Sequence, residues 1–254
     1  MQLMKPADNG YYCSMAREKG YGQFCPVARA AEILTERWVP LLVRELLCGS
    51  TRFNDLQRGV PRMSSYLLSR RLKELEYAGI VETRPLKKGR GSEYHLTDAG
   101  KELFPVIEGM GVWAQRWVRD DLVVDDNLDP DLLMWDIRRT VTVGDLVVEN
   151  RFTVRFEFAG VKSNQRRYWL VFERGEVDLC AKDPGFEVDL YVSCHVRVLT
   201  EIWLGHKTIN ETVRAETLTL DGSAKDRRAF SDWFGGSVFE KHGREKPGAP
   251  QAAE

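Results

Sequence analysis

The most constraining feature of the sequence is a series of apolar residues at helical spacing between positions 25 and 80, interrupted by turn residues. The spacing predicts helices over 27–34, 38–48 and 53–59, followed by a longer helix over 65–78. Two short helices, a turn and a longer helix are the spacing of a helix-turn-helix unit. This order of elements therefore favours a small helical domain that presents one helix to a partner.

The long helix has two contrasting faces. Leu68, Leu72 and Leu75 recur at the spacing of one buried stripe, which alone is also typical of an ordinary amphipathic surface helix. The opposite face is polar, and a helix that enters the major groove contacts base edges from its N-terminal turns. The residues expected to contact bases are Ser65, Tyr66, Ser69, Arg70 and Lys73.

A basic hairpin is predicted directly after this helix. Residues 80–84 and 92–97 alternate as two strands, joined by the tip LKKGRG. A positive hairpin tip suits contact with phosphates or with a minor groove. Basic residues of the helical region are expected to contact phosphates together with those of the tip. The full set is Arg52, Arg62, Arg71, Lys87, Lys88 and Arg90.

Charge divides the chain into two halves. Residues 1–120 carry 19 Lys and Arg against 14 Asp and Glu, whereas residues 121–254 carry 18 against 24. Ten of the basic residues lie between positions 52 and 90. The asymmetry predicts two domains with different partners, the first of which is a polyanion such as double-stranded DNA.

A strongly apolar helix is expected from Asp98 to about Val118. Its stripe is too apolar for an isolated surface helix, so we expect it to pack against the same helix of a second chain. The alternative is that the stripe packs on the second domain of its own chain. The residues expected at a homodimer interface are Leu103, Val106, Ile107, Met110, Trp113 and Trp117.

The region from Cys25 to about Trp117 resembles the HxlR family of winged-helix regulators. The resemblance rests on CPVARAAEIL, ERW, RELLCGSTRFNDLQRGV, LSRRLKELEYAGIVETR and EYHLTDAG, in that order. It implies a dimer that binds a palindromic operator, and a cysteine at Cys25 where some members sense oxidants or electrophiles. Burial as a small apolar residue is the alternative for Cys25, and Cys13 is a candidate redox partner. The family commonly has a basic residue at Tyr66, so Tyr66 either contacts a base or packs.

In the second half of the chain, apolar and polar residues alternate with a period of two, which is typical of strands. Four strands are expected in 151–160, 166–175, 176–183 and 186–194, with spacings that favour an antiparallel meander. Helices at 196–205 and 208–215, a strand at 216–222 and a last helix at 223–235 follow. Asp129 and Pro130 are expected to start a short helix before the strands.

The predicted fold class is α+β, in which a winged helix-turn-helix precedes a sheet-and-helix domain. Its parts are an N-terminal extension (1–24), a DNA-binding domain with the dimerisation helix (25–120), the α+β domain (128–238) and a disordered tail (239–254).

The second half looks like the sterol-carrier-protein-like domain, with YWLVFERGEVDLC followed by FEVDLYVSCHVRVLTEIWLGHKTINETVRAETLTLDG. This resemblance implies a sheet with helices on one face around a cavity for a small apolar ligand. Each residue named as a lining candidate is also typical of a plain core. The candidates are Phe156, Phe158, Trp169, Leu199, Trp203, Phe230 and Trp233.

The sequence gives little support to catalysis. The four histidines show no metal-binding or triad spacing, and no phosphate-binding glycine loop is present, so we expect no enzyme activity, cofactor or metal. No apolar run has the length of a membrane span, and the start of the chain lacks a secretion signal, which predicts a cytoplasmic protein. Three hypotheses follow: a regulator that responds to an apolar ligand, a constitutive DNA-binding domain fused to a lipid-binding or dimerisation module, and a thiol sensor acting through Cys25.

Overall fold

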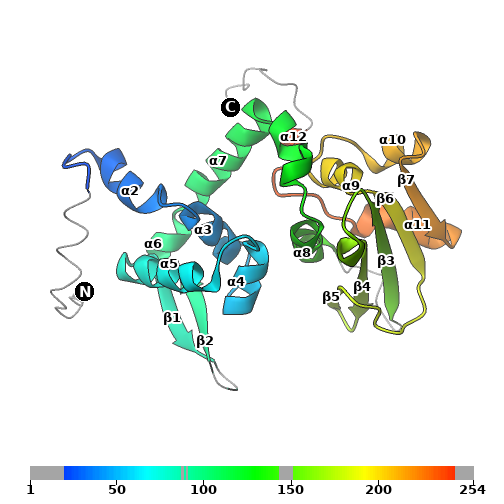
Figure 1. Cartoon of the computed structure of the whole chain (residues 1–254), viewed down its shortest axis with the longest axis horizontal. Coiled ribbons are helices and arrows are strands. Elements are labelled where there is room, and N and C mark those ends of the chain that lie inside the picture. The colour runs from blue at the N-terminus through cyan, green and yellow to red at the C-terminus, as the bar shows by residue number, and fades with distance from the viewer. Residues whose placement is uncertain (1–19, 87–88, 90, 143–150, 244–254) are drawn as a thin grey trace.

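The computed structural model describes residues 20–86, 89, 91–142 and 151–243. Its first part is a helical unit with a two-stranded hairpin, and its second part is built on a five-stranded sheet (Figure 1). The first part contains α2 (Pro26–Leu34), α3 (Val39–Leu47), α4 (Phe53–Gly59), α5 (Ser65–Tyr77), β1 (Val81–Pro85), β2 (Ser92–Leu96), α6 (Asp98–Lys101) and α7 (Phe104–Trp117).

The predicted helices of the first part are confirmed with small shifts at their ends. Leu42, Leu56 and Leu68 are fully buried where α3, α4 and α5 meet, so the stripes seen in the sequence form one core. The prediction of one continuous helix over 98–118 is wrong, because this segment is divided into α6 and α7. Pro105 lies in the first turn of α7, a position where its missing N–H leaves no hydrogen bond unmade.

The second part begins with two short 3₁₀ turns and then alternates helices with the sheet. The short helix predicted at Asp129 and Pro130 is confirmed, since the Asp129 carboxylate accepts hydrogen bonds from the backbone N–H groups of Asp131 and Leu132. The elements are η1 (Asp120–Val123), η2 (Asp125–Asn127), α8 (Pro130–Thr140), β3 (Phe152–Ala159), η4 (Ser163–Gln165), β4 (Arg167–Glu173), β5 (Glu176–Cys180), β6 (Leu190–His195), α9 (Val196–Trp203), α10 (Ile209–Arg214), β7 (Leu218–Gly222), α11 (Ala224–Trp233) and α12 (Glu240–Gly243).

The strand order corrects the expected meander. The five strands lie in the order β5-β4-β3-β6-β7, and β6 pairs parallel with β3 rather than antiparallel with β5. β3 is buried along most of its length and needs a neighbour on each edge, whereas β5 is partly exposed and suits an edge. Asp189 fixes the crossover, because its carboxylate accepts a hydrogen bond from the Thr153 N–H and its own N–H donates to the Thr153 carbonyl.

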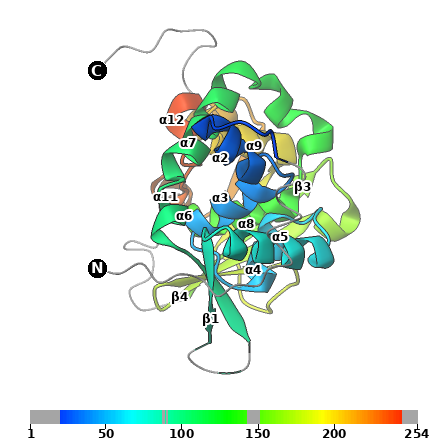
Figure 2. The same ribbon diagram turned by 90° about the vertical axis from the view of Figure 1, so that its left-hand side faces the viewer.

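Two separate cores hold the two parts. One is formed by α3, α4, α5, the hairpin and the start of α7, and the other by α8, the sheet, α9 and α11. Figure 2, a view turned by 90°, also shows α3, α4 and α5 above the projecting hairpin. Each core is therefore built from residues of one part of the chain.

The beginning of the predicted disordered tail is ordered. Residues 240–243 form α12, which packs on α7, and a Cβ added at Gly111 would overlap the Phe239 ring. The rest of that tail, 244–254, lies outside the described residues, as do residues 1–19 of the extension. Among the residues that the structure describes, no helix has the length and apolarity needed to cross a membrane.

A polar contact joins α7 to the second part. Gln115 is 2% exposed; its amide N–H donates to the Leu204 carbonyl, and its amide oxygen lies 2.8 Å from Nε2 of His206. This geometry makes neutral His206 the donor. Burial, and next the charge of Arg119, lower the pKa of His206 to about 4, although Glu201 and Asp120 oppose the shift.

The lowered pKa predicts a loss of stability in mild acid. The unfolded chain binds a proton at His206 near its ordinary pKa of about 6.5, whereas the folded chain does so only near 4. The stabilisation is therefore complete above pH 6.5 and is lost as the pH falls towards 4. Melting temperatures measured across this range should fall more steeply for the wild type than for His206→Gln. Parallel curves for the two proteins would rule out this role of His206.

Candidate nucleic-acid interface

α5 presents a capped N-terminus and a polar outer face. The Ser64 hydroxyl accepts a hydrogen bond from the Leu67 N–H, which satisfies one of the free donors at the start of the helix. Leu68, Leu72 and Leu75 hold the inner face in the core. Tyr66 is 80% exposed, so its side chain does not pack inside this chain and is available to a partner.

The other residues expected to contact bases lie along the same helix. Ser65 and Lys73 are exposed, and Ser69 is half-buried on the flank. Arg70 is exposed, and its Nε lies 2.8 Å from a carboxylate oxygen of Glu74, one turn further on. This surface ion pair is weak, so Arg70 can exchange Glu74 for a base edge at little cost.

The hairpin lies next to α5 and projects from the domain. Its strands pair antiparallel from Val81 opposite Leu96 to Pro85 opposite Ser92. Gly79, with a φ of 72°, allows the chain to leave α5 and enter the hairpin. Arg52 joins the hairpin through a bridge to Glu93 and stays largely exposed. The tip residues Lys87, Lys88 and Arg90 lie outside the described residues.

Two more of the residues expected to contact phosphates have intramolecular partners, as Arg52 does. The expectation for Arg71 is wrong for this conformation, because its side chain is only 12% exposed. It pairs with Glu36 and Glu74 and donates to the Arg37 carbonyl, which ties α5 to the loop before α3. Arg62 stays exposed but donates a hydrogen bond of 2.9 Å to the Asp126 carbonyl.

α7 exposes most of the stripe that was expected at a dimer interface. Two members of that set lie elsewhere: Ile107 is buried in the domain core and Leu103 packs against it, because they face α3. The remaining four are strongly exposed, at 47% for Val106, 52% for Met110, 57% for Trp113 and 63% for Trp117. The alternative, that this stripe packs on the second domain, holds only for the neighbouring face with Gly111 and Gln115.

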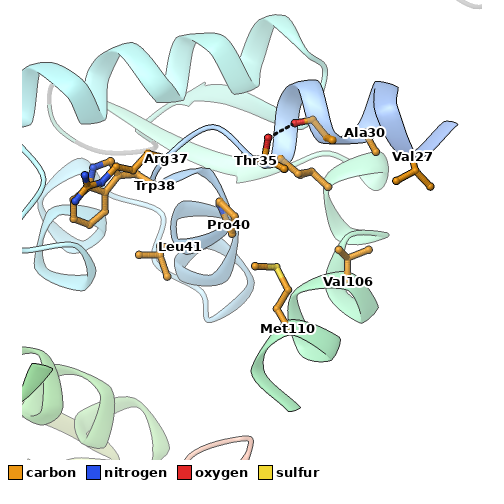
Figure 3. A pocket seen from close by; sticks show the side chains of 11 residues that line it. Val27, Ala30, Thr35, Arg37, Trp38, Pro40, Leu41, Val106 and Met110 are labelled. Carbon is orange, nitrogen blue, oxygen red and sulfur yellow. Dashed lines mark hydrogen bonds between the residues drawn. The ribbon is translucent and has the colours of Figure 1, made fainter. Parts of the chain in front are cut away.

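An apolar groove of about 620 Å³ lies between α2, α3 and α7 (Figure 3). Val27 and Ala30 of α2, Leu41 of α3 and Val106 and Met110 of α7 line it. Val27 is 75% exposed, so the apolar face of α2 is not buried within this chain. Sequence reasoning missed the contribution of α2 to this surface, although the apolar spacing of the helix was visible.

The residues expected to line a ligand cavity in the second part lie mostly in its core. Phe156, Phe158, Leu199, Phe230 and Trp233 are each at most 1% exposed, and Trp169 is 4% exposed. Phe230 and Trp233 pack edge to face with 5.0 Å between their ring centroids. A second cavity, of about 210 Å³, lies by Lys207, Asn210 and Ser231, and it contains none of the expected residues. Trp203 is partly buried against the same core.

Cys25 is the N-cap residue of α2 and is partly exposed. Cys13 lies outside the described residues. Within the described ranges, no three His, Cys, Asp or Glu side chains gather in a way that could hold a metal ion.

The arrangement of α3, α4, α5 and the hairpin defines a winged helix-turn-helix domain. The family model for the HxlR-like helix-turn-helix matches residues 33–121. The HTH-type transcriptional regulator YvaP of Bacillus subtilis is 41% identical over 98 residues, which are 38% of this chain and 91% of that protein. The chain therefore belongs to the HxlR family of helix-turn-helix transcriptional regulators.

A further relative is the HTH-type transcriptional regulator YodB of Bacillus subtilis, which is 35% identical over 37% of this chain and 85% of its own length. The solved structure of its reduced form matches 39% of this chain and 98% of that protein at 33% identity, with a TM-score of 0.34. The family model ends at residue 121, so the second part lies outside it.

Proposed function

We propose that this chain is a homodimeric transcriptional regulator that binds a palindromic DNA operator in the cytoplasm and is not an enzyme. The observation that carries the proposal is the outer face of α5, where Tyr66, Arg70 and Lys73 are exposed on a capped helix held by buried leucines. Helices of this kind contact base edges in the major groove, and an adjacent hairpin contacts the backbone.

The proposed dimer forms through α7. Its four exposed apolar side chains and the groove beside α2 form one apolar surface, and large surfaces of this kind are rare on monomers. The occupant we propose is the same surface of a second chain, because a two-fold interface is self-complementary. Such a pair carries two α5 helices, which a palindromic operator requires.

The second part is proposed to bind a small apolar ligand. Support comes from a mainly antiparallel sheet whose inner face is covered by helices, as the resemblance to sterol-carrier-protein-like domains implies. Because the expected lining side chains are packed together, a ligand has to part them, for example Phe230 from Trp233. A constitutive fusion to a lipid-binding or dimerisation module is the alternative.

A thiol sensor is the second candidate function. Cys25 lies at the start of α2, next to the groove proposed as the dimer interface, and is partly exposed. Oxidation there would act on the dimer rather than on the second part. An operator affinity that responds to oxidants in the wild type and not in Cys25→Ser would favour this candidate.

Arg70→Ala tests the assignment of α5. If Arg70 makes a bidentate base contact, its loss should reduce discrimination between operator and mutated operator by ~1–3 kcal/mol. Arg71→Ala is the matched control, because Arg71 is tied to Glu36 and Glu74 inside the chain and should lower thermal stability instead. Measured affinities of both variants for the operator and the mutated operator separate a loss of discrimination from a loss of stability. If Arg70→Ala weakens binding to every duplex equally, α5 is not the base-contacting helix.

A further inference from the structure

α8 belongs to both parts of the chain at once. Leu133, Met134 and Ile137 are buried in the core of the sheet domain. Trp135 and Asp136, at 4% and 5% exposed, face the other way, towards α3 and α4 of the winged helix. α8 therefore contributes to the packing of both parts.

Four charged side chains lock α8 to α3. An Arg44 nitrogen lies 2.6 Å from a Glu45 oxygen and 3.0 Å from an Asp136 oxygen, and an Arg139 nitrogen lies 2.8 Å from Glu45. Arg139 also pairs with Asp136. Burial resists ionisation of Glu45, but Arg44 and Arg139 outweigh it, so the pKa of Glu45 lies below its usual value. Buried pairs of this kind fix a geometry because breaking them leaves a charge uncompensated.

Trp135 adds a second fixing point beside these charges. The guanidinium of Arg58, on α4, lies 5.2 Å from the centre of the indole ring, and Arg139 of α8 lies 5.7 Å from it. Cation–π contacts of this kind attract when they are desolvated. α3 and α4, the two helices directly before α5, are thus attached to α8.

The second part of the chain also contacts α7. Gln115 binds the Leu204 carbonyl and His206, and Phe239 lies against Gly111. Within the winged helix itself, α7 enters the core only near its start, through Leu103 and Ile107. The C-terminal half of α7 is therefore positioned by the second part of the chain.

We propose that the second part is a brace that sets the angle between the helix-turn-helix and α7. This inference rests on the proposed dimer, in which α7 lies at the interface and α5 contacts DNA. If α7 defines the dimer axis, the angle between α7 and α5 determines how far apart the two α5 helices lie. The brace then decides which spacing of half-sites is bound, and a change inside the sheet domain alters that spacing through α8 and α12.

The test uses the full chain with both contacts weakened, as Asp136→Asn with Gln115→Leu. Glu173→Gln is the matched control, because it removes one carboxylate from an exposed pair with Arg151 in the sheet domain. Binding is measured to an isolated half-site and to operators whose half-site spacing differs by one or two base pairs. The wild type and the control should bind the operator of one spacing roughly tenfold more tightly than the others, a difference of the size that loss of one base contact causes. The double variant should bind all spacings within about threefold and the half-site as the wild type does.

A second measurement does not need DNA. Spin labels are placed at Ala78→Cys, the exposed C-cap of α5, and Asp178→Cys on β5, with the other accessible cysteines changed to serine. The distance distribution should be narrow in the wild type and control and broad in the double variant. Unchanged distances and an unchanged spacing preference would overturn the brace and leave the DNA-binding proposal standing. Broadened distances in a chain that binds no duplex would support the brace and refute the DNA-binding proposal.

Discussion

Replacing Met110 and Trp113 together by glutamate is expected to convert the protein from dimer to monomer and to weaken operator binding by at least about a hundredfold. Both side chains are more than half exposed in the single chain, at 52% and 57%, on one face of α7. In the proposed dimer they are buried, and a carboxylate buried without a partner costs several kcal/mol. A monomer binds one half-site at a time and loses the gain from simultaneous engagement of two.

The matched control is Val213→Glu, which places a carboxylate on an apolar side chain of α10 that is 40% exposed and far from α7 in the fold. Light scattering gives the mass of each protein, and fluorescence anisotropy gives its operator affinity. The control should remain dimeric with unchanged affinity. A dimeric Met110→Glu/Trp113→Glu protein with full affinity would show that α7 is not the interface.

Glu45→Ala is expected to lower the free energy of unfolding by about 3–5 kcal/mol, the cost of removing one partner from a buried ion pair. The Glu45 side chain is completely buried, and its carboxylate lies between Arg44 and Arg139 and accepts a hydrogen bond from Ser50. Without it, two arginines share Asp136 alone. A Cβ at Gly59 would overlap the same carboxylate, so the space around it is also tightly filled.

Urea unfolding followed by circular dichroism measures this loss. Glu173→Ala removes a carboxylate from an exposed pair and should change stability by at most about 1 kcal/mol. Equal stability of the Glu45→Ala and Glu173→Ala proteins would mean that the buried cluster does not hold the two parts together.

The sequence predicts α5 and the hairpin well because their signals are local. The leucine spacing of α5, the serine before it and the alternation of the two hairpin strands each lie within a few residues, and the structure reproduces their order with small shifts at the ends. Arg71 is different, because its side chain faces Glu36 and Arg37, more than 30 residues earlier. Helical periodicity places Arg71 near the polar face but contains no information about that loop.

The strand order and the contact between the parts are non-local and could not be predicted in the same way. Alternation of apolar and polar residues locates β3 and β6. It does not show that they are parallel neighbours in the sheet, although β4 and β5 lie between them in the sequence. Glu45 did leave a signal, since it is an acidic residue within the apolar stripe of its helix. Its partner Arg139 is 94 positions away, so the stripe alone could not identify the pair.

The central claim, that the chain is a sequence-specific DNA-binding regulator, is tested most directly by binding of the purified, reduced protein to duplex DNA from around its own gene at increasing salt concentrations. We predict tight binding to one sequence, much weaker binding to a scrambled duplex of equal length, and an affinity that falls linearly with the logarithm of the salt concentration as phosphate contacts are lost. Failure of the folded protein to bind any duplex, or binding with no preference for sequence, would contradict the claim.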